Sequence, residues 1–222
     1  MNDSVDPYDI VRRGYDKVSE AYRSDNFEFE GTGYQEIVSE FTSRLDPGSR
    51  VLDIGCGCGI PVSQVLSADY DVLGVDYSPV QIQRARALVP DALFLCEDMT
   101  ALRFQEDSFD GIISLFAIIH VPVGEQLSLF AEIVKWLRPD GVLAVTVGHT
   151  AWTGTEANWR DVPGGTMYWS HAEADTYVQW IEALELEVEC CLLYTSPSPR
   201  DRSAYLVCRL LLEKGGGGGG GG

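Results

Sequence analysis

The sequence is poor in basic residues. It holds 16 lysines and arginines against 34 aspartates and glutamates, so its formal net charge is −18. A protein that binds a phosphate backbone needs a positively charged surface, because much of that affinity comes from neutralising phosphates. The charge balance therefore predicts a chain that does not bind nucleic acid.

Long apolar runs are also missing. No stretch approaches the roughly 20 apolar residues that span a bilayer, and the N-terminal segment MNDSVDPYDI is too acidic and polar for a secretory signal. These absences predict a cytoplasmic chain that does not bind membranes. A length of 222 residues and an apolar fraction of 45% suit a globular domain with a sizeable core.

The sequence also lacks the spacing of histidines and cysteines that is typical of metal sites. Three histidines and six cysteines are scattered along the chain, without the paired spacing that is typical of zinc sites. Cys56 and Cys58 are separated by one glycine, which is too close for an ordinary disulfide. We therefore expect no metal ion in this protein.

Strand and helix patterns alternate along most of the chain. Runs rich in valine, isoleucine and leucine alternate with helical segments, which predicts a parallel sheet covered on both faces. Helices are expected at residues 6–23, 34–45, 60–68, 79–88, 124–137 and 171–184, strands at 50–55, 71–76, 92–96, 109–116, 141–148 and 184–190, and a loop at 150–169. The order predicts an α/β fold, Rossmann-like and doubly wound, with a mostly parallel sheet. Residues 1–190 are expected to form one domain, with residues 1–48 as a helical cap and 49–190 as its core.

The strongest local signal is VLDIGCGCGIP at residues 51–61. Gly55, Gly57 and Gly59 follow a buried strand and precede a helix, where glycine lets the backbone approach a ligand closely. The spacing is GxGxG, whereas dinucleotide-binding loops have GxGxxG. The segment resembles the first motif of class I methyltransferases, which use S-adenosylmethionine.

This resemblance implies S-adenosylmethionine as the cofactor and gives roles to particular residues. Asp53 would orient the loop near the methionyl amine, and the carboxylate of Asp76 would accept hydrogen bonds from the ribose hydroxyls. Asp98 would bind the adenine amino group, while Met99 packs on the ring. The implied cofactor-binding residues are Tyr15, Asp53, Gly55, Cys56, Gly57, Gly59, Asp76, Tyr77, Asp98, Met99, Ser114 and Leu115.

Two histidines are candidates for catalysis. An acceptor that must lose a proton needs a base, and ligands of parallel sheets bind outside the carboxyl ends of the strands. His120 and His149 follow the fourth and fifth predicted strands, whereas His171 is a weaker candidate. For each of them, a hydrogen-bonded structural histidine is the alternative. The aromatic segment 152–171 predicts either the walls of an acceptor pocket or a packed lid without ligand contact.

The C-terminal residues have an unusual composition. Residues 191–201 (CLLYTSPSPRD) and 206–214 (LVCRLLLEK) resemble the translation, in one frame, of an adapter used in DNA sequencing, and eight glycines follow. We therefore expect residues 191–222 to be a non-native tail, with the last strands of the natural sheet truncated or replaced. The apolar stretch in 206–214 is nevertheless compatible with a strand.

Together these features predict an enzyme that transfers a methyl group from S-adenosylmethionine to oxygen, nitrogen or carbon of a small-molecule acceptor. Two alternatives stay open. One is a catalytically silent module that keeps the cofactor site, and the other is a NAD-type oxidoreductase, which GxGxxG spacing would favour. The sequence does not indicate the acceptor or the oligomeric state.

Overall fold

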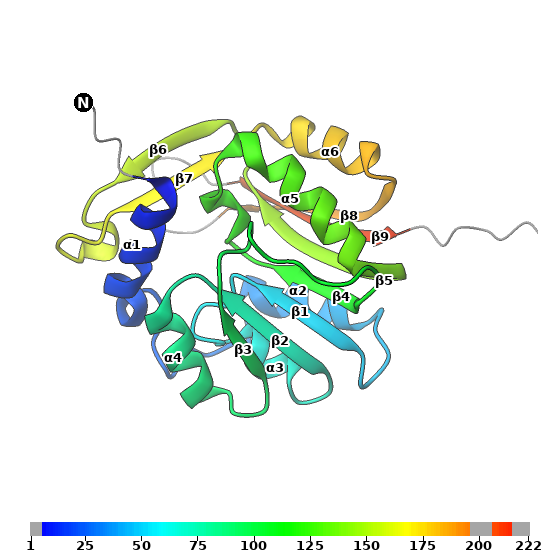
Figure 1. The fold of residues 1–222 in the computed structure, drawn as a ribbon, viewed down its shortest axis with the longest axis horizontal. Coiled ribbons are helices and arrows are strands. Elements are labelled where there is room, and N and C mark those ends of the chain that lie inside the picture. Colours follow the sequence, from blue (N-terminus) through cyan, green and yellow to red (C-terminus); the bar gives the residue numbers. More distant parts are fainter. Residues whose placement is uncertain (1–5, 196–205, 215–222) are drawn as a thin grey trace, which may run out of the picture.

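The computed structural model describes residues 6–195 and 206–214, and its main feature is a seven-stranded sheet. The strand order is β3-β2-β1-β4-β5-β9-β8 (Figure 1). Strands β1 to β5 run parallel, whereas β9 and β8 are antiparallel to their neighbours. The strands are β1 (Arg50–Ile54), β2 (Asp71–Asp76), β3 (Leu93–Cys96), β4 (Phe109–Ser114), β5 (Leu137–Val147), β8 (Leu186–Thr195) and β9 (Leu206–Lys214). The predicted α/β class is confirmed.

Helices cover both faces of this sheet. They are α1 (Pro7–Tyr22), α2 (Gly33–Thr42), α3 (Val62–Leu66), α4 (Pro79–Leu88), α5 (Val123–Trp136), α6 (Ala174–Ala183) and the short 3₁₀ turn η1 (Ile118–His120). Leu52 packs with α5 and α6 in one core cluster, and Val51 packs with α2 and α3 in another. Neighbouring strand residues point to opposite faces, so a strand buried on both sides needs apolar residues on both faces. Val51, Leu52 and Ile54 supply them in β1.

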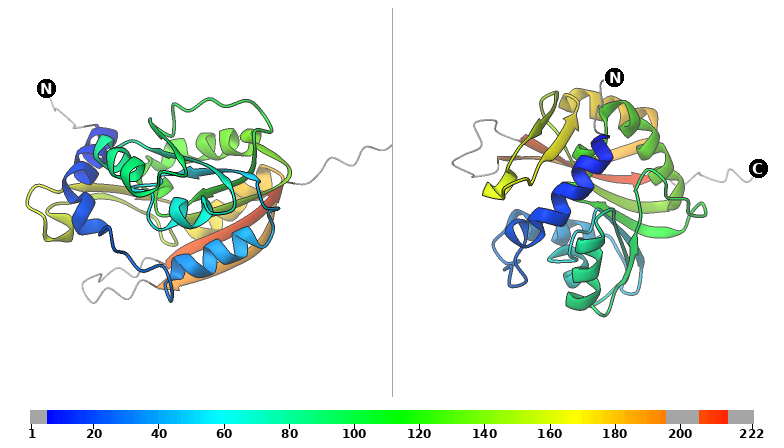
Figure 2. Two further views of the ribbon diagram at one scale, coloured as in Figure 1. Left: turned by 90° about the horizontal axis from the view of Figure 1, so that it is seen from below. Right: turned by 60° about the vertical axis from the view of Figure 1, so that its left-hand side comes forward.

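Helix α1 lies at one end of the sheet, where it packs against α4, η1, the strand β7 (Met167–His171) and the turn η2 (Trp159–Asp161) (Figure 1, Figure 2). Asp6 caps its first turn, since the side chain accepts a hydrogen bond from the Tyr8 N–H at 3.1 Å, and Pro7 occupies the first helical position. The start of this helix can be predicted from adjacent residues, Asp6 and Pro7. Its position over the strand ends depends on contacts with distant segments.

The segment predicted as a loop at 150–169 is largely a β-hairpin, so that prediction is wrong. Strand β6 (Trp152–Glu156) pairs antiparallel with β7 (Met167–His171), and η2 (Trp159–Asp161) lies between them. The alternation of apolar and polar residues that indicates a strand is hard to see here, because a glycine stands where a side chain would be expected. Gly154 pairs with Trp169, and the Trp152 ring leaves no room for a side chain at Gly154. His171 consequently ends β7 instead of starting the last helix.

Two further differences concern strand ends. β5 begins at Leu137, earlier than predicted, and passes through Asp140 at a φ of +63°. β8 and β9 lie largely in the residues predicted to be a non-native tail, and β9 pairs with β5. None of the helices in the described residues is long and apolar enough to cross a membrane.

Candidate functional site

The glycine loop after β1 needs glycine for steric reasons. Gly55, Gly57 and Gly59 have φ values of +75°, +56° and +79°, a region that other residues enter at a cost. A Cβ on Gly55 would lie 2.1 Å from the Cβ of Ala117. A Cβ on Gly57 would meet only Gln81, at 3.8 Å. The middle of the loop is thus open, and its first residue is tightly enclosed.

Asp76 joins this loop to the end of β2. The Gly57 N–H donates to its Oδ2 at 3.0 Å, and the Ser78 N–H donates to its Oδ1 at 2.8 Å. Burial raises the pKa of Asp76 to about 6, and nearby Asp16 adds to this, although the two N–H groups oppose it. Each carboxylate oxygen keeps a lone pair for a further donor. This is the geometry expected for a carboxylate that binds two hydroxyl groups.

Asp53 lies beneath the loop and is 2% exposed. Its Oδ2 accepts a hydrogen bond from the Ser63 hydroxyl at 2.6 Å. Burial raises the pKa of Asp53 to about 7, against the effect of the Ser63 hydrogen bond, and Asp76 contributes in the same direction as burial. A cationic group bound beside Asp53 would favour its ionised form.

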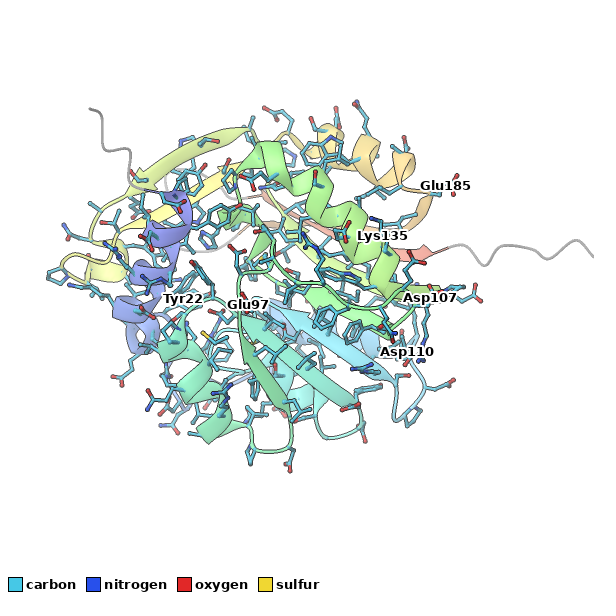
Figure 3. All side chains as sticks on the ribbon, in the orientation of Figure 1. Tyr22, Glu97, Asp107, Asp110, Lys135 and Glu185 are labelled. Atoms are coloured by element: carbon cyan, nitrogen blue, oxygen red, sulfur yellow. The ribbon has the colours of Figure 1, made fainter. Side chains whose placement is uncertain are left out.

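A pocket of about 390 Å³, open to solvent, lies beside the loop. It is lined by Tyr22, Arg23, Tyr34, Asp53, Gly55, Cys56, Gly57, Cys58, Ile60, Pro61, Val62, Gln81 and Leu115. Figure 3 shows Tyr22 on the side of α1 that faces the sheet, whereas Asp107 and Asp110 lie at the opposite end of the strands. The pocket therefore contains both residues that the sequence predicted and residues that the sequence analysis did not select.

Arg23, Tyr34 and Gln81 are among the lining residues that the sequence analysis did not select. Arg23 follows α1, Tyr34 belongs to α2 and Gln81 to α4. Their meeting depends on how α1 packs against α4, which no spacing rule predicts. One feature of the sequence could have pointed to Arg23: it is a single arginine in an acidic, aromatic segment, RSDNFEFEGTGY.

The residues after β3 and β4 surround the other side of the loop. Oδ1 of Asp98 accepts hydrogen bonds from the backbone N–H and the hydroxyl of Thr100, both at 2.8 Å. The Met99 methyl group would lie 3.8 Å from a Cβ on Gly55, so it borders the glycine loop. Ser114 is wholly buried and donates to the Ile54 carbonyl at 3.0 Å, so it supports the loop from within the sheet. The Tyr77 carbonyl lies 3.8 Å from the sulfur of Cys96.

His120 forms a hydrogen-bonded chain with α1 and β7. Its Nδ1 lies 2.6 Å from the Tyr168 carbonyl oxygen, which can only accept, so Nδ1 carries the proton. Nε2 then accepts from the Tyr15 hydroxyl at 2.9 Å. Burial lowers the pKa of His120 to about 4, although the Tyr168 carbonyl opposes this, and burial raises the pKa of Tyr15. Both side chains are thus neutral at pH 7.

Aromatic rings enclose this pair. We call Tyr15, Tyr22, His120, Trp159 and Trp169 the aromatic cluster. Ring centroids within it lie 5.3 to 5.9 Å apart. The cluster joins α1, η1, η2 and β7, and it makes one wall beside the strand ends.

Two other predicted groups of this region are not members of the cluster, although the Trp152 ring centroid lies 6.1 Å from that of Trp169. His149 follows β5, and its Nδ1 lies 3.3 Å from the hydroxyl oxygen of the adjacent Thr150. Trp152 is 42% exposed. Within residues 6–195 and 206–214, no group of three or more histidine, cysteine or carboxylate side chains is placed to hold a metal ion.

Comparison with known proteins bears on this geometry. Residues 51–141 match the family model described as a methyltransferase domain. The magnesium protoporphyrin IX methyltransferase of Synechocystis, solved with bound S-adenosylmethionine, superposes with a TM-score of 0.68 at 18% identity, covering 96% of this chain and 100% of its own. The chain has the class I methyltransferase fold.

This methyltransferase fold also occurs in proteins of other chemistry. The [4+2]-cyclase SpnF has a TM-score of 0.66 at 20% identity, covering 92% of this chain and 95% of its own. In sequence, the 2-methyl-6-phytyl-1,4-hydroquinone methyltransferase of Synechocystis is 40% identical over 107 residues, which are 46% of this chain and 32% of that protein. The chain thus matches only about a third of that relative's length.

Proposed function

We propose that this chain transfers a methyl group from S-adenosylmethionine to a small-molecule acceptor. The glycine loop carries the proposal: its Gly57 N–H donates to Asp76 at the ends of adjacent parallel strands, within the segment that matches the methyltransferase family. The open space over Gly57 and the free lone pairs of Asp76 fit a nucleoside. Bound S-adenosylmethionine supplies a methyl group on a positively charged sulfur.

The residues around the loop support specific roles. Asp76 would hold the ribose hydroxyls, and Asp53 would face the ammonium group of the amino-acid end. Met99 borders Gly55 and would pack on the adenine, whose amino group Asp98 would bind through Oδ2, because Oδ1 already accepts from Thr100. The backbone of the loop allows close approach, since two of its glycines could not carry a side chain without displacing Ala117 or Val89.

On the acceptor side, the hydrogen bonds favour His120 over His149 as the catalytic base. Neutral His120 has its Nε2 lone pair directed at the Tyr15 hydroxyl. Tyr15 can therefore accept a proton from an acceptor and pass its own proton to Nε2. His149 lies outside the aromatic cluster and stays the second candidate.

The aromatic cluster supports an apolar or aromatic acceptor, because such rings dominate small-molecule sites. The hydroquinone methyltransferase of Synechocystis is named for an acceptor of this kind. The net charge of −18 supports the prediction that nucleic acid is not the substrate. Whether oxygen, nitrogen or carbon receives the methyl group stays open.

The test is calorimetry with S-adenosylhomocysteine and with NADH, followed by mass spectrometry of products from a panel of phenols, amines and quinols. We expect S-adenosylhomocysteine to bind and one class of acceptor to gain a methyl group. Binding without any methylated product would favour the silent module. Binding of NADH alone would favour the oxidoreductase.

A further inference from the structure

Two glycines bring helix α1 directly against the β6–β7 hairpin. Gly14 lies in the middle of α1 and is buried, and a Cβ there would lie 2.3 Å from the carbonyl oxygen of Thr166, the residue before β7. Carbon and oxygen atoms that are not bonded normally stay about 3.3 Å apart or more. An alanine at this position would therefore require the helix and the hairpin to separate by about 1 Å.

Gly165 makes the reciprocal contact from the hairpin. A Cβ on this buried glycine would lie 2.6 Å from the Cγ1 methyl group of Val18. Val18 follows Gly14 by about one helical turn, so the two residues lie on the same face of α1. The two close contacts are thus adjacent, and each of them depends on a glycine that carries no side chain.

This contact lies beside the hydrogen bond between Tyr15 and His120. Tyr15 follows Gly14 in α1, whereas His120 is tied to the other side, because its Nδ1 donates to the carbonyl oxygen of Tyr168 in β7 at 2.6 Å. The 2.9 Å bond from the Tyr15 hydroxyl to Nε2 therefore joins α1 to the β7 side. A separation of about 1 Å would stretch this bond to about 3.9 Å, which is too long for a hydrogen bond.

We propose that Gly14 and Gly165 are positioning residues for the acceptor side of the reaction. They act through Tyr15: because they allow α1 to lie on the hairpin backbone, its hydroxyl is held at the lone pair of His120 Nε2. This inference rests on the proposed function, in which Tyr15 takes a proton from the acceptor and passes its own proton to Nε2. Loss of the close contact would interrupt that proton path between Tyr15 and His120.

The test is the ¹⁵N NMR spectrum of the His120 ring, recorded on the full chain without cofactor or acceptor. The Nε2 signal reports whether this nitrogen accepts a hydrogen bond, and His120→Asn assigns it by its disappearance. Tyr15→Phe removes the donor and gives the signal of the free nitrogen. We expect Gly14→Ala to move the Nε2 signal at least about half of the way to that of Tyr15→Phe, because a hydrogen bond weakens steeply as its geometry is lost.

Gly124→Ala is the matched control. Gly124 also lies in a helix, α5, but a Cβ there would meet no atom within 4 Å. An alanine fits at this position without displacing a neighbour, so the His120 signals should stay as they are in the wild type.

A second variant tests the contact from the hairpin side and can be rescued. Gly165→Ala should move the Nε2 signal in the same direction as Gly14→Ala does. Adding Val18→Ala should return the signal toward its wild-type position, since it removes the methyl group that the new Cβ would strike. Val18→Ala alone should leave the Nε2 signal in place, because it shortens a side chain without forcing the elements apart.

The outcomes separate this inference from the proposed function. A wild-type Nε2 signal in Gly14→Ala and Gly165→Ala would overturn the positioning role, and so would a shift in Gly165→Ala that persists after Val18→Ala is added. If Gly14→Ala does not fold, Gly165→Ala and its rescue decide alone. Calorimetry of the wild-type protein with S-adenosylhomocysteine tests the proposed function independently. Failure to bind would overturn that function, whereas the hydrogen bond seen in the NMR spectrum would stand.

Discussion

At the scale of single residues, burial sets the charge states of the site. His120 is 6% exposed and Asp53 is 2% exposed, and each prefers its neutral form because water cannot solvate the charged one. For His120 this keeps Nε2 an acceptor of the Tyr15 hydroxyl. For Asp53 it leaves a carboxyl group that a bound ammonium would convert to the carboxylate. Binding of an ammonium group beside Asp53 is therefore coupled to the loss of that carboxyl proton.

The lowered pKa of His120 predicts a loss of stability in acid. The pKa is about 4 in the folded protein and 6.5 in the unfolded chain, so the unfolded chain takes up the proton first as the pH falls. The contribution is complete above pH 6.5 and is lost between pH 6.5 and 4. We expect the wild type to lose about 2 kcal/mol of unfolding free energy between pH 7 and pH 5, relative to His120→Asn.

Urea unfolding of both proteins at the two pH values checks this. Other groups that titrate in the range, including Asp53 and Asp76 with their raised pKa values and the neighbouring His171, are present in both proteins and largely cancel. Parallel pH profiles for the wild type and His120→Asn would show that His120 is not held neutral.

Asp76 should control nucleoside binding. We expect Asp76→Ala to weaken the affinity for S-adenosylhomocysteine about a hundredfold or more, because two charge-assisted hydrogen bonds to the ribose are lost together with the acceptor of the Gly57 N–H. Calorimetry measures the change. Asp69→Ala, in an exposed position before β2, is the control and should bind as the wild type does. Unchanged affinity in Asp76→Ala would refute the ribose assignment.

At the scale of elements, a polar contact fixes α1 to α4. Ser78 is the N-cap of α4, where its hydroxyl oxygen accepts the Gln81 N–H at 3.1 Å, and the same hydroxyl donates to Asp16 of α1 at 2.6 Å. Ser78→Ala should therefore cost about 1–2 kcal/mol of unfolding free energy. Ser67→Ala, in which the lost hydroxyl bonds only to Gln64 of the preceding turn, should cost less than about 0.5 kcal/mol. Equal losses in urea unfolding would argue against the contact.

A buried glutamine joins the elements around His120. Nε2 of Gln126 lies within 3.1 Å of the carbonyl oxygens of Ile118, Val121 and Ser170, and Oε1 accepts the Tyr177 hydroxyl at 2.6 Å. Gln126→Leu keeps much of the volume and leaves these groups without partners, so we expect a loss of about 3 kcal/mol or more. Chemical unfolding measures the loss, and exposed Gln64→Leu is the control. A loss below about 1 kcal/mol would mean that the network contributes little.

What the sequence predicts at this scale depends on how local the signal is. β2 and α4 were predicted with their observed bounds, because their signals lie in residues that are adjacent in the sequence. For β2 the signal is a buried apolar run, and for α4 it is the N-cap Ser78 followed by Pro79. The glycine loop and Asp76 were found for the same reason. The β6–β7 hairpin was missed because its pattern appears only when Gly154 is set opposite Trp169. Arg23 was missed because its place in the pocket depends on where α1 packs.

At the scale of the whole molecule, the fold alone does not determine the chemistry. The sheet places five strand ends beside one another, and that arrangement is shared by proteins named as methyltransferases and by one named as a cyclase. A fold hosts more than one reaction. The side chains around the strand ends, His120 and Asp76 above all, therefore carry the functional argument.

The last two strands carry a prediction about the natural protein. β9 pairs with β5 along residues whose letters resemble a translated adapter, and an exposed strand edge accepts any apolar segment of suitable β propensity. We expect a long read across the 3′ end of the source gene to depart from CLLYTSPSPRD after Cys190 and to encode another apolar strand for the edge of β5. Protein made from that gene should melt at a higher temperature than the printed chain, because its own strand is matched to this edge. A read that reproduces CLLYTSPSPRD and the eight glycines would contradict the prediction and make β8 and β9 the protein's own strands.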